Sequence, residues 1–314
     1  MSGEAVGALL WCVIAIQAMA GRSWLGPIEV LFLLAPLVHV QLGFRVVQRQ
    51  LDEYSPVGRV ARALLPFAGV LAAASFGPPA GRTAAVLAAG WLLVCGLAAL
   101  DGLWRLLHGA YRSVESLCNS VSFLYLAVGA VWLVLSRLGI TPFHLPAQTV
   151  LLAAVHFTFT GFTLPIVASA TVRALRARKP FADAAVAGAV FRFVAAGILL
   201  GPPFLAAGNI LAVPWLKLVG ALLLAVVSIV LAGLLITLLP EITPRSASVL
   251  LGISAISLAA GMTLVGVYAV GEFTERYWLL IPQMARFHGT ANALGFAFCG
   301  LLGWTLAGHD NFTR

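Results

Sequence analysis

The sequence predicts an all-α membrane protein, a bundle of about ten transmembrane helices with both termini in the cytoplasm. Apolar residues make up 61% of the 314 residues, charged residues make up 10%, and the mean hydropathy is +1.01. Soluble domains are only roughly half apolar. The apolar residues occur in runs close to the ~20 residues that cross a bilayer as a helix. Because lipid offers no hydrogen bonds to the backbone, these runs are expected to be helical.

Each predicted span follows from one such run. The spans are expected at residues 6–20, 28–44, 61–75, 82–106, 117–138, 147–174, 182–207, 214–239, 246–270 and 288–307. No low-complexity linker sets a soluble domain apart from these runs. Residues 1–314 are therefore expected to form a single membrane-embedded domain.

The basic residues predict the orientation of the spans. They gather in the loops after spans two, four, six and eight: Arg45, Arg49, Arg59 and Arg62, then Arg105 and Arg112, then Arg173, Arg176, Arg178 and Lys179, then Arg245. The other loops are poorer in Lys and Arg, so the basic loops and both termini are expected in the cytoplasm. The formal charge of +8 thus indicates membrane topology and not a nucleic-acid partner.

Cysteines and prolines add two expectations. Cys12, Cys95, Cys118 and Cys299 lie in or beside apolar runs without metal-ligand spacing, which favours buried thiols and predicts no metal or cofactor. Pro36, Pro165 and the Pro202–Pro203 pair predict irregular helices in spans two, six and seven.

A set of polar residues falls in the predicted outer half of the bilayer, where each unpaired polar group costs several kcal/mol. The richest stretch is residues 281–298, IPQMARFHGTANALGFAF. The members of the set are Glu29, His39, His156, Thr160, Glu272, Arg286, His288 and Asn292. Their shared depth makes one common pocket geometrically possible. Structural roles for single histidines, and a solvated loop around Glu272, are the alternatives.

A second polar pair is expected nearer the cytoplasm. Arg192 lies nine residues into span seven, where we expect it to need an acidic partner or backbone carbonyls. Asp101 in span four is the best candidate by depth, and a structural ion pair is the expected outcome. Asn119 and Tyr125 are candidates to complete that network.

Three stretches carry a family resemblance: IEVLFLLAPLVHVQLGFRV (28–46), AAVHFTFTGFTLPI (153–166) and IPQMARFHGTANALGFAFCGLLGW (281–304). Together they resemble the YndJ-like bacterial integral membrane proteins, which implies the cytoplasmic (inner) membrane of a bacterium. The family's span-six motif usually reads HFHYAGF; here Thr158 and Phe159 replace its second histidine and its tyrosine. This departure implies changed chemistry or substrate if that histidine serves the family's common activity.

The chain also bears a weaker similarity to small membrane-embedded bacterial cyclases that fold the prenyl chain of indole or diketopiperazine metabolites. That similarity implies a proton-initiated terpene cyclase, an isomerase for a lipophilic substrate that enters from the lipid bilayer. Such an enzyme needs a carboxylic acid in an apolar pocket, aromatic faces for carbocations and a final base. Glu29 and Glu272 are the candidate acids, and His156 and His288 are the candidate partners or bases. The candidate substrate-binding residues are His39, Thr160, Phe159, Phe162, Arg286, Asn292 and Phe296.

Two other functions stay open. A proton-coupled secondary transporter of a small or lipidic solute would use Asp101, Arg192 and His156 as a relay, with helices broken at Pro36 and Pro165. Against it, the polar residues cluster on one side and no inverted repeat is seen. A scaffold or sensor without chemistry is the third reading.

Overall fold

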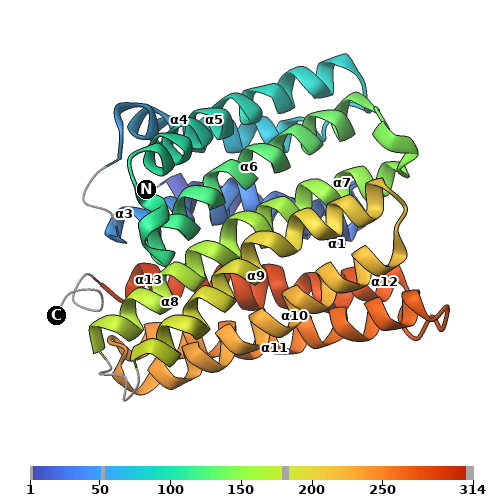
Figure 1. The fold of residues 1–314 in the computed structure, drawn as a ribbon. Coiled ribbons are helices and arrows are strands. Elements are labelled where there is room, and N and C mark those ends of the chain that lie inside the picture. Colours follow the sequence, from blue (N-terminus) through green and yellow to red (C-terminus); the bar gives the residue numbers. More distant parts are fainter. Residues whose placement is uncertain (1–2, 51–53, 179–183, 309–314) are drawn as a thin grey trace. The chain divides into compact units, whose positions relative to one another are not determined.

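The computed structural model of the chain describes residues 3–50, 54–178 and 184–308 (Figure 1). Among these residues, eight helices are long and apolar enough to cross a membrane. A shorter apolar helix, α1 (Gly3–Met19), precedes them, and a helical run over residues 281–306 follows them. The expectation of an all-helical, polytopic bundle is confirmed, and no strand occurs in the described ranges.

The helices fall into two compact units, which are described separately. Unit 1 comprises Met1–His108 and Ser120–Phe162, and unit 2 comprises Gly109–Asn119 and Thr163–Arg314. Helix α6 (Val114–Leu138) contributes to both units. Unit 1 also contains α1, α2 (Pro27–Leu34), η1 (Ala35–His39), α3 (Val40–Gln50), α4 (Pro56–Ala74), α5 (Arg82–Leu107) and α7 (Ala147–His156).

In unit 1, the second span is the most enclosed helix. It consists of α2, η1 and α3, and 83% of its membrane-spanning window is buried. Helices α1 and α4 both pack against its middle segment η1, and α4 packs along α5. The core contains a cluster of rings in which Phe44 lies 4.8 Å from Phe123 and 6.5 Å from Phe162, measured between ring centroids.

Unit 2 is a series of long helices packed side by side (Figure 1). Its elements are α8 (Leu164–Arg178), α9 (Ala184–Ile210), α10 (Pro214–Leu238), α11 (Arg245–Phe273), α12 (Ile281–Met284), η6 (Ala285–Gly289), η7 (Ala291–Phe298) and α13 (Cys299–Leu306). Helix α10 packs between α9 and α11, and α11 packs against η7 and α13 of the last span.

Three spans contain π-helical segments, in which each hydrogen bond reaches five residues back along the chain in place of four. These segments are η1 in span two, η4 (Phe157–Thr163) in span six, and η6 with η7 in span ten. Well under 1% of residues in proteins are π-helical, and such turns are frequent at functional sites. All of the π-helical segments in the described ranges fall inside the three stretches that carry the family resemblance.

Glycines on neighbouring helices allow a close approach to these segments. A Cβ atom added at Gly7 would lie 1.9 Å from the carbonyl oxygen of Leu37, and one at Gly69 would lie 2.4 Å from that of Pro36. In unit 2, a Cβ added at Gly295 would lie 2.1 Å from the Ser257 hydroxyl oxygen. Any larger residue at these glycines would force the helices apart, since no real Cβ contact is this short.

The predicted irregularity is present in spans two and six, but the prediction was wrong for span seven. Helix α9 continues as one helix through Pro202 and Pro203, and the glycines Gly197 and Gly201 pack it tightly against Val227 and Leu224 of α10. Span ten begins at Ile281, seven residues before the predicted start at His288, so His288 lies further into the span than expected. The predicted start of span seven, Ala182, and the basic residue Lys179 lie outside the described residues.

The contact between α1 and η1 predicts the effect of a single methyl group. We expect Gly7→Ala to lower the apparent midpoint of thermal unfolding in detergent by about 5 °C, because overpacking costs about 1–3 kcal/mol. Gly96→Ala in α5 is the matched control, since a Cβ there meets no atom within 4 Å. That control should unfold at or above the temperature of the native chain, because Ala favours helix over Gly. Equal midpoints for the two variants would show that the close contact does not limit stability.

Candidate functional site

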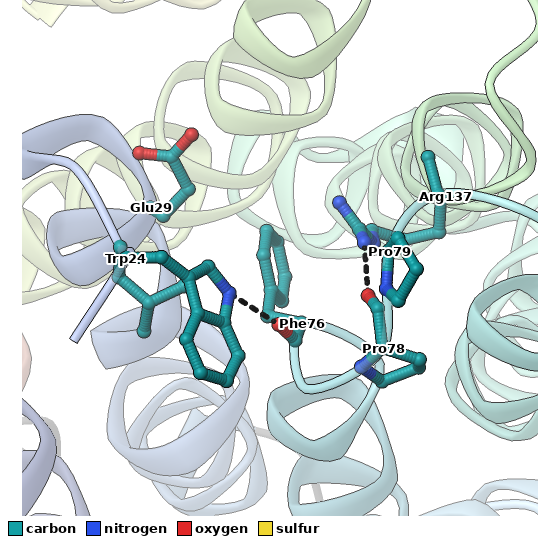
Figure 2. Close-up of a pocket in the computed structure, with 8 residues that line it drawn as sticks. Trp24, Glu29, Phe76, Pro78, Pro79 and Arg137 are labelled. Carbon is teal, nitrogen blue, oxygen red and sulfur yellow. Dashed lines mark hydrogen bonds between the residues drawn. The ribbon is translucent and has the colours of Figure 1, made fainter.

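A small surface cavity in unit 1 contains one of the predicted acids, Glu29 (Figure 2). The cavity has a volume of about 220 Å³ and is lined by Trp24, Leu25, Glu29, Phe76, Pro78, Pro79, Ala80 and Arg137. Glu29 lies in the first turn of α2 and is half-buried. Among the described residues its carboxylate makes no hydrogen bond or ion pair, so it is available to a ligand.

The wall opposite Glu29 is built around Arg137 at the end of α6. The guanidinium donates hydrogen bonds to the carbonyls of Ser75 and Pro78, at 3.1 and 3.0 Å, and lies 4.7 Å from the centroid of the Phe76 ring. The Trp24 indole donates to the Phe76 carbonyl at 3.0 Å, so the loop after α4 is held from both sides. In Figure 2 the Glu29 carboxylate and Arg137 lie on either side of Phe76, and their charges interact across the cavity.

The two predicted histidines of unit 1 do not line this cavity. His39 ends the π-helical segment η1, is fully buried, and contacts Phe159 edge-on at 5.2 Å between ring centroids. His156 is the last residue of α7, immediately before η4, and its Nδ1 lies 2.7 Å from the Leu152 carbonyl. Since a carbonyl only accepts, Nδ1 of His156 must carry the proton, which leaves Nε2 of a neutral ring as an acceptor.

The predicted aromatic residues of unit 1 are packed against one another. Phe159 is 8% exposed and Phe162 is fully buried within the ring cluster of Phe44 and Phe123. Thr160 is half-buried. These side chains stabilise the unit, and they line no described cavity.

In unit 2, His288 and Asn292 form one hydrogen-bonded group against α11. Nδ1 of His288 lies 3.0 Å from the Gly261 carbonyl. The amide nitrogen of Asn292 donates to the His288 carbonyl at 3.1 Å, and it lies 2.9 Å from Nδ1 and 3.3 Å from Nε2 of the ring. The hydrogen bonds thus fix the orientation of the imidazole on the π-helical segments.

The other predicted residues of unit 2 lie nearby in the sequence but have separate partners. Glu272, near the end of α11, forms an ion pair with Lys217 of α10 at 2.5 Å. Arg286 is exposed and its guanidinium lies 5.7 Å from the centroid of the Phe287 ring. Phe296 is buried at 3% exposure, and its carbonyl accepts a hydrogen bond from the Ser254 hydroxyl at 2.9 Å.

The four predicted catalytic residues are therefore divided between the units. Glu29 and His156 belong to unit 1, and Glu272 and His288 belong to unit 2. A pocket shared by all four stays a prediction. No three His, Cys, Asp or Glu side chains in the described ranges are grouped so that they could hold a metal ion.

The expected pairing of Asp101 with Arg192 was wrong. Asp101 is 1% exposed and pairs with Arg105 one turn away, at 2.7 Å. It also accepts a hydrogen bond from the backbone of Ser55, the first residue before α4. Arg105 lies on the same helix as Asp101 at i, i+4 spacing, which brings its guanidinium next to the carboxylate. Arg192 is exposed on α9.

Tyr54 completes this buried group and was not predicted. Its ring lies 5.3 Å from the guanidinium of Arg105, and its hydroxyl donates to the Phe44 carbonyl at 2.6 Å. Burial raises the pKa of Tyr54, so the hydroxyl stays protonated and keeps this donor role. Tyr54 directly follows Asp52 and Glu53 in the sequence, so nothing in the sequence indicated that it is buried.

The cavity residues other than Glu29 were also missed. Trp24 and Arg137 were not among the predicted site residues. Phe76 and the Pro78–Pro79 pair follow α4 and carried no functional pattern. Only the tertiary contacts of the loop after α4 bring these residues together with Glu29.

Comparison with known proteins places the chain in a family without assigning an activity. The model of the YndJ-like protein family matches residues 30–296. The chain is 24% identical over 220 residues to the uncharacterized membrane protein YndJ of Bacillus subtilis (strain 168), covering 69% of this chain and 37% of that protein. The chain thus spans little more than a third of the length of this curated relative. No solved structure matches. The match to the family model covers most of the chain, which therefore belongs to the YndJ-like protein family.

Proposed function

We propose that this membrane protein is an isomerase of the terpene-cyclase type, in which Glu29 protonates the end of a lipophilic prenylated substrate such as a farnesylated indole or diketopiperazine. The observation that carries the proposal is the half-buried Glu29 carboxyl group, which has no hydrogen bond or ion pair among the described residues and faces a cavity beside aromatic side chains. A proton donor of a cyclase needs access of this kind, and Trp24 and Phe76 supply aromatic faces to the cavity beside it.

The size and position of the cavity fit a substrate that stays partly in the lipid. Pockets that enclose a drug-sized ligand have volumes of about 300–1,000 Å³. At about 220 Å³, the Glu29 cavity would hold only one end of a prenyl chain. Trp24 is 75% exposed at its rim, as expected of a side chain at the membrane interface. The terminal alkene would reach the acid first, while the rest of the chain stays outside.

The reaction balances without a co-reactant. The Glu29 carboxyl proton adds to the terminal alkene, the resulting cation closes a ring by forming a carbon–carbon bond, and a base removes a proton from the cyclised product. His156 supports the last step in this proposal, because its Nε2 is the acceptor nitrogen of a neutral ring. The product is an isomer of the substrate. Glu272 would join the reaction only after its ion pair with Lys217 opens.

A proton-coupled transporter is the second candidate, and the π-helical segments favour it. Carriers often place their substrate sites at interrupted membrane helices, where irregular backbone lines the site. Spans two, six and ten run on as continuous helices but contain π-helical turns, which are frequent at functional sites, and His39, His156 and His288 lie in or beside those turns. The relay would begin at these histidines, since Asp101 is closed off by Arg105.

For the cyclase, we expect Glu29→Gln to lower product formation by at least ~100-fold, because loss of a general acid costs 10²–10⁴ in rate. The measurement is the conversion of farnesylated indoles by membranes containing the protein, read as a product of equal mass and shifted retention time. Glu275→Gln is the matched control, since Glu275 is an exposed loop residue. Equal conversion by the two variants would remove Glu29 as the acid. A native chain that forms no isomer from any prenylated indole or diketopiperazine would contradict the cyclase.

For the transporter, we expect proteoliposomes to take up solute only under a proton gradient, and His156→Gln to abolish the dependence on that gradient. Asp101→Asn is expected to lower stability instead, because it removes one charge of the buried ion pair with Arg105, at a cost of about 3–5 kcal/mol. Asp101→Asn combined with Arg105→Gln should restore part of that stability. Gradient-driven uptake that is unchanged in His156→Gln would contradict this relay.

A further inference from the structure

An arginine lies on the exposed stripe of helix α9, within a membrane span. Exposed positions recur along this helix at Ala185, Ala189, Arg192, Ala196 and Leu200, which is the i, i+3, i+4 spacing of one helix face. Every other member of this stripe is apolar. Among the described residues Arg192 makes no hydrogen bond or ion pair. Its charge therefore has no protein partner in the part of the chain that the structure describes.

Such a charge is stabilised by an anionic group within reach of the side chain. An arginine in the hydrocarbon costs at least about 2.5 kcal/mol, and this cost falls when the side chain extends to the interface.

The side chain runs back along α9 towards the N-terminal end of that helix. A Cβ added at Gly188 would lie 3.3 Å from a terminal nitrogen of the Arg192 guanidinium, and no other atom lies within 4 Å of that Cβ. The guanidinium thus lies over Gly188, one turn before its own residue. At 1.5 Å per residue, Arg192 itself is about 12 Å from the first residue of α9, but Gly188 is only about 6 Å from it. This depth is that of the boundary between hydrocarbon and headgroups.

Among the described residues, the acid near this position is already paired; Asp183, which precedes α9 in the sequence, lies outside them. Arg176 of α8 lies 5.6 Å from the ring centroid of Phe191, the residue before Arg192, but it is neutralised by an ion pair with Glu115 at 3.1 Å. The loop between α8 and α9 is predicted to face the cytoplasm from its basic residues. Anionic headgroups of the inner leaflet are attracted to such juxtamembrane arginines.

We propose that Arg192, whose guanidinium lies over Gly188, binds the phosphate of a phospholipid in the leaflet at the N-terminal end of α9. The planar guanidinium donates two parallel hydrogen bonds to phosphate oxygens, which a lipid without phosphate cannot accept in the same way. Gly188 has no side chain, which leaves room for the guanidinium over it. This site is independent of the Glu29 cavity and of the proposed chemistry.

The test is native mass spectrometry of the full chain in detergent, titrated with phosphatidylglycerol. The comparison ligands are a diacyl glycolipid of equal chain length without phosphate, and inorganic phosphate as a competitor. We expect Arg192→Gln to weaken phosphatidylglycerol binding about fivefold, in line with the attraction of one juxtamembrane arginine to anionic lipid. Arg82→Gln is the matched control, since it removes an exposed arginine at the start of α5 and should leave binding unchanged.

A second variant separates lipid binding from folding. Gly188→Leu keeps the charge of Arg192 but places a side chain where the guanidinium lies, since a Cβ there would already be 3.3 Å from its terminal nitrogen. It should weaken phosphatidylglycerol binding as Arg192→Gln does, and Arg192→Lys should keep part of the binding. Binding equal to that of the native chain in both Arg192→Gln and Gly188→Leu would overturn the proposal. So would equal binding of the phosphate-free glycolipid, or displacement of the lipid by equimolar inorganic phosphate, which would mark a site for a soluble anion.

Discussion

The close contact between a glycine and a backbone carbonyl of the buried segment η1 is the constraint on which unit 1 depends. The segment η1 presents the carbonyls of Pro36 and Leu37 to its neighbours, and Gly69 of α4 and Gly7 of α1 approach them without a side chain. In lipid, helices gain little from burying apolar surface against one another, so close packing of backbones provides much of the association. Gln41 also donates to the Leu37 carbonyl at 2.8 Å. The irregular segment is therefore held by packing and by hydrogen bonds.

Unit 2 uses the same arrangement with different residues. The Ser254 hydroxyl donates to the Phe296 carbonyl of η7, and Gly295 admits Ser257 beside that segment. His288 and Asn292 are bonded to each other and to α11 through the Gly261 carbonyl. Polar side chains that looked like catalytic candidates in the sequence thus also hold an irregular helix in place. These residues can hold the helix and also take part in chemistry, because an imidazole held by hydrogen bonds presents one nitrogen in one direction.

Hydropathy and charge were sufficient to predict the spans because bilayer thickness fixes the length of a helix that crosses it. The predicted and observed ends differ by six residues or fewer for the other spans, and by seven at the start of the last one. The partners of the buried charges were not predictable in the same way. Asp101 pairs with Arg105 and accepts a hydrogen bond from the Ser55 backbone, while the Arg192 guanidinium lies over Gly188 of its own helix. Depth along a span says nothing about the side of the helix on which a residue lies. For this reason only part of the Glu29 cavity was predicted. The acid was a candidate from the sequence, but the loop after α4 that lines the cavity was not.

The π-helical segments have a consequence for how related chains are compared. A hydrogen bond that spans five residues in place of four accommodates one more residue in the turn, while the helix on either side keeps its direction. Loss or gain of a single residue at such a turn would convert it to a regular α-helical turn, or the reverse, without moving the neighbouring helices far. Relatives of this chain can therefore differ by one-residue gaps inside spans two, six and ten. An alignment that forbids gaps within membrane helices would shift every position beyond such a turn by one, and would place the histidines of these spans opposite the wrong partners.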